Sequence, residues 1–271
     1  MSGGPVRPVG SAVDAETRAA RPPALPSRFG WTDFVVMPVF LGLVLLVLWQ
    51  WISHQDLDPI ERVTLAWPNV RRRIVEHIQL TALSTVLVLI IAIPLGILLT
   101  RRQARRFAPF ALALANVGQA TPAIGLLVLL TLWLGVGVKV AIIGAVAYAV
   151  LPVLSNTIAG LEDVDRQLVE AARGIGMSMP GVLFKVEFPL AVPLVLAGVR
   201  NALVLNVGTA TLATFVNAGG LGDIIQDGIL LQRTVVLIVG SVLTVVLALT
   251  VDWLASLAEQ GLRPRGLRNG G

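Results

Sequence analysis

Long uncharged, apolar runs alternate with short polar segments along most of this chain. A helix needs about 20 apolar residues to cross the hydrocarbon core of a bilayer. Six runs come close to or exceed that length, and we expect one membrane span from each: 34–52, 78–100, 107–138, 140–161, 190–217 and 234–253. The pattern therefore predicts an all-α polytopic membrane protein whose transmembrane domain covers residues 34–258.

The third run is too long for one straight span and too short for two. It contains two prolines, Pro109 and Pro122, and a small polar cluster made of Asn116, Gln119 and Thr121. Proline removes a backbone donor and disfavours helix in the residue before it. We interpret the run as a single span that is preceded or broken by irregular backbone.

Residues 162–189 form a polar, charged segment between two apolar runs, EDVDRQLVEAARGIGMSMPGVLFKVEFP. Two amphipathic stripes at helical spacing run through it. The first stripe is Leu168, Ala171, Ala172 and Ile175, and the second is Met179, Val182, Leu183 and Val186. Two short helices outside the membrane need something to cover their apolar faces, so the segment predicts a docked soluble partner.

Capping residues set the expected limits of these two short helices. Asp163 or Asp165 can cap the first helix, and Gly174 is expected to end it as a left-handed glycine. Ser178 can cap the second helix, and Pro189 is expected to mark the start of the next span. The predicted result is a compact protrusion that is joined stiffly to the span beginning at residue 190.

Composition supports a membrane location. Of the 271 residues, 55% are hydrophobic and only 14% are charged, whereas soluble proteins have about 25% charged residues. There is no cysteine and there are two histidines, so we expect no metal site. Residues 1–33, rich in Pro, Ala and Arg, are expected to form a disordered cytoplasmic tail, and residues 259–271 a second cytoplasmic tail.

The placement of positive charge predicts the orientation. If residues 162–189 are cytoplasmic, both termini are cytoplasmic too, and fourteen Lys and Arg lie inside against six outside. Membrane proteins favour cations on the cytoplasmic side. The run Arg71–Arg73 is the exception, and it can begin an amphipathic helix on the outer surface. We expect a multi-pass protein of a bacterial or archaeal cytoplasmic membrane.

No enzymatic constellation is visible. The chain lacks GxxxxGK[ST], GxSxG and HExxH, and we expect no cofactor. The predicted spans hold no carboxylate apart from Asp252, near the end of the last one. Proton- and sodium-coupled carriers commonly use such groups. The pattern favours a transport subunit whose energy comes from another polypeptide.

The polar segment carries a recognisable motif. Glu170, Ala171 and Ala172 are followed by Gly176 and then by Val186 and Pro189, which resembles the EAA motif of ABC importer permeases. Further likeness lies in Arg101-Arg102, in Leu151-Pro152, in the run NVGTATL from Asn206 and in GGLG from Gly219. Over residues 70–235 the chain is similar to the glycine betaine, carnitine and choline branch of that superfamily.

The resemblance implies a fold, a function and a set of partners. It implies a MetI-like core of five helices, here preceded by one extra helix. It also implies two ATP-binding subunits docked on the loop, a second permease chain that is identical or homologous, and an extracytoplasmic solute-binding protein. The coupling residues would be Glu170, Ala171, Ala172, Gly176, Val186 and Pro189.

Other polar residues in the spans have two interpretations. They can line a pathway, or they can join helices through hydrogen bonds. The candidates are Asn116, Gln119, Thr121, Asn206 and Thr209. Arg200 also has two interpretations: it can have a functional role, or its side chain can simply extend toward the inner membrane surface. Residues 217–233, rich in glycine, are expected to form an outer loop with a short helix near 223–231, as part of a gate or as a plain connector.

The alternatives differ in substrate and in class. The solute can be a compatible solute, or an amino acid, methionine or ergothioneine. The chain can also be a membrane scaffold or an ATP-independent carrier, and uptake that persists without the ATPase would favour the carrier.

Overall fold

The computed structural model describes residues 31–262. Most of each expected tail, 1–33 and 259–271, lies outside the described residues, but residues 31–33 belong to the first helix and residues 259–262 to the last one. The chain forms two compact units, residues 1–40 and residues 41–271, and helix α2 (Trp31–Ser53) contains the boundary between them. All regular structure in residues 31–262 is helical, as the apolar pattern predicts.

Five helices of the described chain are long and apolar enough to cross a membrane. All five follow predicted spans but differ at their ends, and four of them are α4 (Trp67–Thr100), α7 (Val138–Glu162), α10 (Phe188–Thr211) and α12 (Thr234–Leu262). The fifth is α2. Helix α4 begins eleven residues before the predicted span, so Arg71–Arg73 lie on the same continuous helix. Pro68 lies in the first turn of α4, where proline is tolerated, and no proline or glycine follows it before residue 78, so the polar turns continue into the apolar span without a break.

The third predicted span is a bent pair of helices. α5 (Ala108–Ala120) and α6 (Ala123–Leu134) meet at an angle of 100°. Thr121 is extended (φ −68°, ψ 136°) before Pro122, as expected for a residue that precedes proline. The pair counts either as one broken span, the sixth, or as a re-entrant segment.

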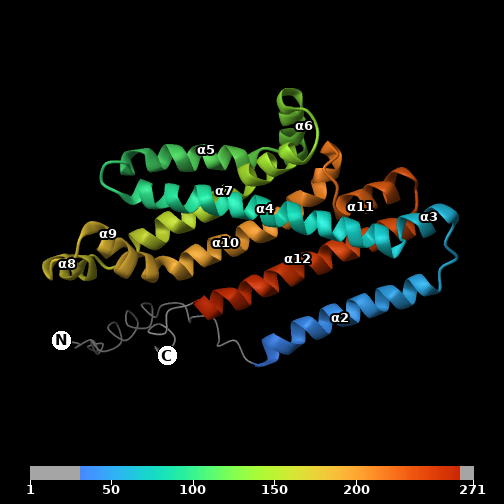
Figure 1. The fold of residues 1–271 in the computed structure, drawn as a ribbon, viewed down its shortest axis with the longest axis horizontal. Coiled ribbons are helices and arrows are strands. Elements are labelled where there is room, and N and C mark those ends of the chain that lie inside the picture. Colours follow the sequence, from blue (N-terminus) through green and yellow to red (C-terminus); the bar gives the residue numbers. More distant parts are fainter. Residues whose placement is uncertain (1–30, 263–271) are drawn as a thin grey trace, which may run out of the picture. The chain divides into compact units, whose positions relative to one another are not determined.

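Helices α4, α7 and α10 pack on one another and form the centre of the larger unit, and α12 packs on α10 (Figure 1). Small residues let the helices approach closely, as is common in membrane bundles. A Cβ on Gly198 of α10 would lie 2.6 Å from the Pro152 carbonyl oxygen of α7. A Cβ on Gly96 of α4 would lie 2.7 Å from a methyl carbon of Thr157 in α7. The core is therefore built on glycine and alanine contacts as much as on large apolar side chains.

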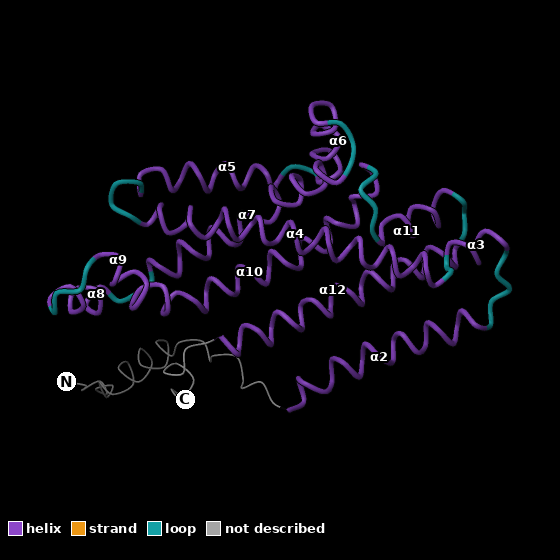
Figure 2. Tube along the Cα trace, in the orientation of Figure 1, coloured by secondary structure: helices purple, strands orange, loops and turns teal. Residues whose placement is uncertain are grey.

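Short helices lie at the two ends of this bundle (Figures 1 and 2). At one end, α8 (Arg166–Gly174) and α9 (Met179–Val182) connect α7 to α10. At the other, a 3₁₀ turn (Leu212–Val216) and α11 (Leu221–Leu230) connect α10 to α12, near α3 (Pro59–Thr64). The short helix predicted near 223–231 is thus α11. We refer below to the α8–α9 end and the α11 end.

Candidate functional site

The α8–α9 loop, residues 162–189, contains both short helices that its pattern predicts. Asp165 is the N-cap of α8, and its Oδ1 accepts a hydrogen bond of 2.8 Å from the backbone N–H of Gln167. Ser178 caps α9, and Pro180 lies in the first turn of that helix. Both caps were readable because a cap depends on residues only two or three positions away.

The turn between the two helices corrects one expectation. Gly174 is the last residue of α8, and the left-handed residue is Gly176, with φ of 88°. The N–H of Gly176 donates to the Arg173 carbonyl oxygen at 2.9 Å, and that of Met177 donates to the Ala172 carbonyl oxygen at 3.1 Å. This pair of bonds is a Schellman motif, in which the residue after the cap is usually glycine. Gly176, a residue of the EAA motif, is therefore the one that reverses the chain.

Pro189 lies at the start of α10, as expected, but it does not interrupt the helix. Helix α9 continues without interruption through a π-helical turn, Leu183–Glu187, into α10, and Pro189 lies in the first turn of α10. Proline is tolerated there because the preceding π turn has already displaced the regular bonding. Helical structure is continuous from Met179 to Thr211, which supports the expected stiff connection between the loop and the next span.

The surface of the loop is apolar at several exposed positions. Ile175 is 81% exposed, Met179 73% and Leu168 50%. Glu170, Ala171 and Gly176 are exposed, whereas Val186 and Pro189 are half-buried. Ala172 is buried and packs inside the loop, so of the two alanines only Ala171 offers a surface to another molecule. The second amphipathic stripe, which begins at Met179, is also partly buried: Met179 is exposed, whereas Val182 is fully buried.

The five candidate pathway residues do not gather in one place. Asn206 is completely buried, its side-chain oxygen accepts from the Thr85 hydroxyl at 2.9 Å, and its amide donates to the Ala145 carbonyl oxygen at 3.1 Å. It thus joins α10 to α4 and α7 and lines no surface. Asn116 is exposed on α5 and Gln119 is half-buried.

Thr121 and Thr209 both lie near Tyr148. The Tyr148 hydroxyl donates to the Thr121 carbonyl oxygen at the break between α5 and α6. Tyr148 and Thr209 also line a small hollow between α6, α7 and α10, whose other lining residues are apolar. Among the five candidates, Thr121 and Thr209 are thus the two that the described structure places beside the same residue, Tyr148.

Arg200 is held by an ion pair that the sequence did not reveal. Its Nε and Nη2 lie 2.6 and 2.8 Å from the two carboxylate oxygens of Asp252. Such a two-bond pair is geometrically specific, and it joins α10 to α12. Arg200 was predicted to extend to the inner surface or to act in function. One sequence signal could have suggested the pair. Arg200 and Asp252 lie at similar distances from the α8–α9 end of the bundle, where α10 begins and α12 ends.

Two further ion pairs fasten the α8–α9 loop to the segment between α4 and α5. Arg101, which follows α4, contacts the buried carboxylate of Glu187 at 2.7 Å. Arg105 contacts Glu162, the last residue of α7, at 3.0 Å. The sequence placed all four residues at the same membrane face but gave no indication of the pairing.

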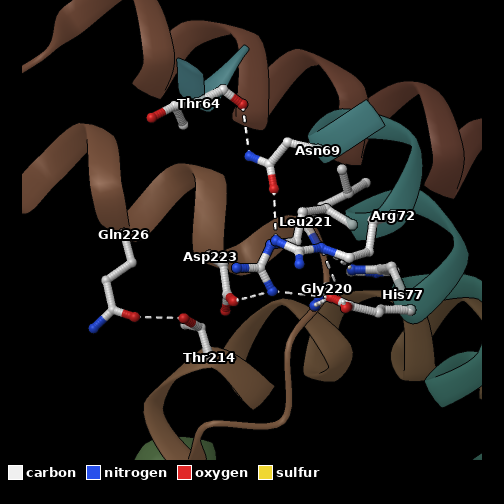
Figure 3. A network of polar contacts seen from close by, with 11 residues as sticks. Thr64, Asn69, Arg72, His77, Thr214, Gly220, Leu221, Asp223 and Gln226 are labelled. Atoms are coloured by element: carbon white, nitrogen blue, oxygen red, sulfur yellow. Dashed lines mark hydrogen bonds and ion pairs between the residues drawn. The ribbon is translucent and has the colours of Figure 1, made fainter. Parts of the chain in front are cut away.

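The α11 end is closed by a polar network (Figure 3). His77 of α4 is fully buried and accepts at Nδ1 from the Leu221 N–H at 3.2 Å, while its Nε2 donates to the Val207 carbonyl oxygen at 3.1 Å. Glu76 accepts from the Gly220 N–H at 3.1 Å, and Arg73 contacts Asp223 at 2.5 Å. The first helical turns of α4 therefore hold the start of α11 in place.

Comparisons with known proteins agree with this arrangement. Residues 92–264 match the family model described as "Binding-protein-dependent transport system inner membrane component". The chain therefore belongs to this family of membrane transport components, the MetI-like ABC permeases, and is a multi-pass protein of the inner membrane.

Its relatives are permeases as well. The choline transport system permease protein OpuBB of Bacillus subtilis is 37% identical over 71% of this chain and 88% of its own. The carnitine transport permease protein OpuCD of Listeria monocytogenes is 38% identical over 69% and 84%. The osmoprotectant import permease protein OsmY of Salmonella typhimurium is 36% identical over 82% and 92%.

Two solved structures share the fold. An inward-facing conformation of the MetNI methionine ABC transporter matches with a TM-score of 0.62 and 25% identity, over 71% of this chain and 95% of that one. A crystal structure of an amino acid ABC transporter with histidines matches with a TM-score of 0.61 and 19% identity, over 76% and 99%. The second shows the fold alone.

Proposed function

We propose that this chain is the permease of an ATP-driven importer for a small osmoprotectant of the glycine betaine, carnitine or choline type. The observation that carries the coupling part of this proposal is the α8–α9 loop. It presents exposed apolar side chains and the carboxylate of Glu170 on a rod that is continuous with α10. Exposed apolar groups of this kind are typical of a protein contact.

The partners follow from this surface and from the family. Two ATP-binding subunits dock on the α8–α9 loops of two permease chains, which are the same or homologous, and ATP hydrolysis takes place on those subunits. A solute-binding protein delivers the osmoprotectant from outside. The α8–α9 end, with the arginines of the α4–α5 connection, faces the cytoplasm, as do both termini. The positive-inside rule supports that orientation.

The substrate part of the proposal is supported by the relatives, whose names give choline, carnitine and osmoprotectants. The contacts and exposure of the five pathway candidates make some of them better candidates than others. Thr121 and Thr209, with Tyr148, are the better candidates to contact solute, followed by the exposed Asn116 and the half-buried Gln119. Asn206 is assigned to helix packing, because every polar atom of its side chain is used inside the bundle.

The docking claim is tested by a charge reversal. Glu170→Lys places a cation where an acidic contact is proposed, and Ile175→Ser removes an exposed apolar group. We expect Glu170→Lys to abolish co-purification of the ATP-binding subunit and Ile175→Ser to weaken it about tenfold, a loss typical of a good interface contact. Arg71→Glu, an exposed charge change at the α11 end, is the matched control for co-purification.

Two results would overturn the proposal. If Glu170→Lys shows normal co-purification and normal uptake, the α8–α9 loop is not part of the contact with the ATP-binding subunit. Uptake by the wild type that persists when the ATP-binding subunit is inactivated would make the chain an ATP-independent carrier.

A second substrate class is favoured by one of the solved structures, a methionine transporter. Thermal stabilisation of the cognate solute-binding protein by candidate solutes separates the two classes. We expect stabilisation by a quaternary ammonium compound and none by methionine.

A further inference from the structure

The connection between α4 and α5, residues 101–107, holds the α8–α9 loop at both of its roots. One root is Glu162 at the end of α7, just before α8, and it pairs with Arg105. The other is Glu187, just after α9, and it pairs with Arg101. The loop is therefore anchored to a segment that is distant in sequence as well as to its own two helices.

The two pairs differ in strength. The side chains of Arg105 and Glu162 are 59% and 42% exposed, and exposed pairs contribute little. The Glu187 side chain is only 10% exposed, and a buried carboxylate without a partner is strongly unfavourable. The pair of Arg101 with Glu187 is therefore the one that fixes the geometry.

Arg101 is itself fixed to the end of α4. Its Nη2 donates to the Thr100 hydroxyl at 3.0 Å, and its Nε approaches the Ile97 carbonyl oxygen at 3.3 Å. A cation at this position also complements the negative end of the helix dipole. The guanidinium is thus bonded to the end of α4 and to Glu187 at the same time. A movement of Glu187 should therefore move the end of α4 as well.

Glu187 lies within the π-helical turn that joins α9 to α10. A π turn is a local departure from regular bonding and is often found at functional positions. Here it directs a carboxylate sideways toward α4 at the point where a displacement of α8 and α9 would enter α10. Helix α4 runs without a break from this point to Glu76 and His77, which hold α11 at the other end.

We propose that Arg101 is a positioning residue for energy coupling. Its ion pair with Glu187 ties α4 to the α8–α9 loop, so that a displacement of the loop moves α4 together with α10. This inference rests on the proposed function, because it requires an ATP-binding subunit that moves the loop. Without the pair, the loop would still dock, but its movement would reach α7 and α10 without being passed directly to α4 by Arg101.

The test measures solute transported per ATP hydrolysed in vesicles that contain the full complex. Arg101→Gln should leave the complex assembled, because the docking surface is unchanged, and should lower that ratio at least about fivefold. Arg102→Gln is the matched control, since Arg102 is the exposed neighbour with no ion pair among the described residues. Arg101→Lys should keep most of the ratio, and the exchange Arg101→Glu with Glu187→Arg should recover part of it.

A second measurement covers the case in which Arg101→Gln does not accumulate. The chain has no cysteine, so cysteines introduced at the exposed positions 102 and 185 give one pair of sites for spin labels in each copy of this chain. We expect the distance between the labels to stay the same when ATP binds to the complex. A distance that changes with ATP overturns the inference, because the two segments would then move separately.

The outcomes separate this inference from the function on which it rests. If the wild type transports without ATP, the proposed function fails and the inference falls with it. If the wild type depends on ATP but Arg101→Gln has the same transport ratio as Arg102→Gln, only the positioning role fails.

Discussion

The two connections at opposite ends of the bundle look similar in sequence but differ in the structure. Both the α8–α9 loop and residues 217–233 are polar or glycine-rich segments between apolar helices, and both contain a short helix. The α11 segment buries Leu221 and Ile224 completely and is bonded to α4 through Glu76 and His77. The α8–α9 loop leaves Ile175 and Met179 exposed and meets the rest of the chain at its roots.

This difference in burial shows whether the apolar side chains of each segment are covered by the same chain or left exposed. The apolar side chains at the start of α11, Leu221 and Ile224, are covered within the chain, so this part of the segment behaves as part of the fold. In the α8–α9 loop, Ile175, Met179 and Leu168 remain exposed in the described structure, so they are available to another molecule. Changes at the α11 end should therefore cost stability, and changes at the α8–α9 end should cost association.

The largest effect is expected from a matched pair of glycine substitutions. A Cβ on Gly222 would lie 2.0 Å from the Thr211 carbonyl oxygen, whereas a Cβ on Gly174 would meet nothing within 4 Å. Gly222→Ala should destabilise the protein by about 2 kcal/mol or more, because backbone must move. Gly174→Ala should be neutral or slightly stabilising, as alanine is the better helix former.

Thermal unfolding of the purified chain in detergent measures both variants. Equal midpoints for Gly222→Ala and Gly174→Ala would mean that α11 is not an integral part of the fold.

A middle-sized effect is expected at Gly176. Alanine in this left-handed position should cost about 1–2 kcal/mol, and the cost falls on the turn between α8 and α9. We expect the unfolding midpoint of the isolated chain to change little, while binding of the ATP-binding subunit and uptake decrease. A lowered midpoint with normal binding would show that the turn stabilises the bundle instead.

The smallest effect concerns pH at the α11 end. Burial, together with the nearby Asp223 carboxylate, raises the pKa of Asp227 above its ordinary value. The folded protein then keeps a proton that the unfolded chain has released, so this group lowers stability as the pH rises from the ordinary pKa through the raised one. Asp227→Asn should therefore stabilise the chain at neutral pH by about 0.5 kcal/mol or less.

Unfolding midpoints at several pH values check this sign. The gain from Asp227→Asn should disappear below pH of about 4, where aspartate is protonated in both states. A gain that is constant with pH would exclude titration of Asp227 as its cause.

Most of the helices could be predicted, and most of the contacts could not. The apolar runs fixed the spans because backbone in lipid must satisfy its own hydrogen bonds, which favours helices. The ends of the spans were less accurate: α4 extends back to Trp67 and α12 on to Leu262, because a helix continues into water as long as no residue stops it. The break before Pro122 was anticipated as irregular backbone, but its 100° bend was not.

The candidate site divides in the same way. Ser178 was identifiable as a cap, and Asp165 as one of two candidates beside Asp163, since each acts on its own neighbours. The left-handed glycine was placed two residues too early, because Gly174 and Gly176 are both compatible with the pattern and only the observed bonds to Arg173 and Ala172 decide between them. The pairing of Arg101 with Glu187, and of Arg200 with Asp252, had no local signal.

By itself, the sequence determined that this chain spans the membrane several times, where its short helices start and which motif it carries. Those properties follow from hydrophobicity and from bonds between near neighbours. Only the tertiary structure decided that Asn206 joins helices, that His77 holds α11 and that Arg101 joins α4 to the α8–α9 loop. These roles depend on groups 61 to 144 residues apart (Asn206 and Ala145 at the near end, His77 and Leu221 at the far end), and only packing brings such groups together.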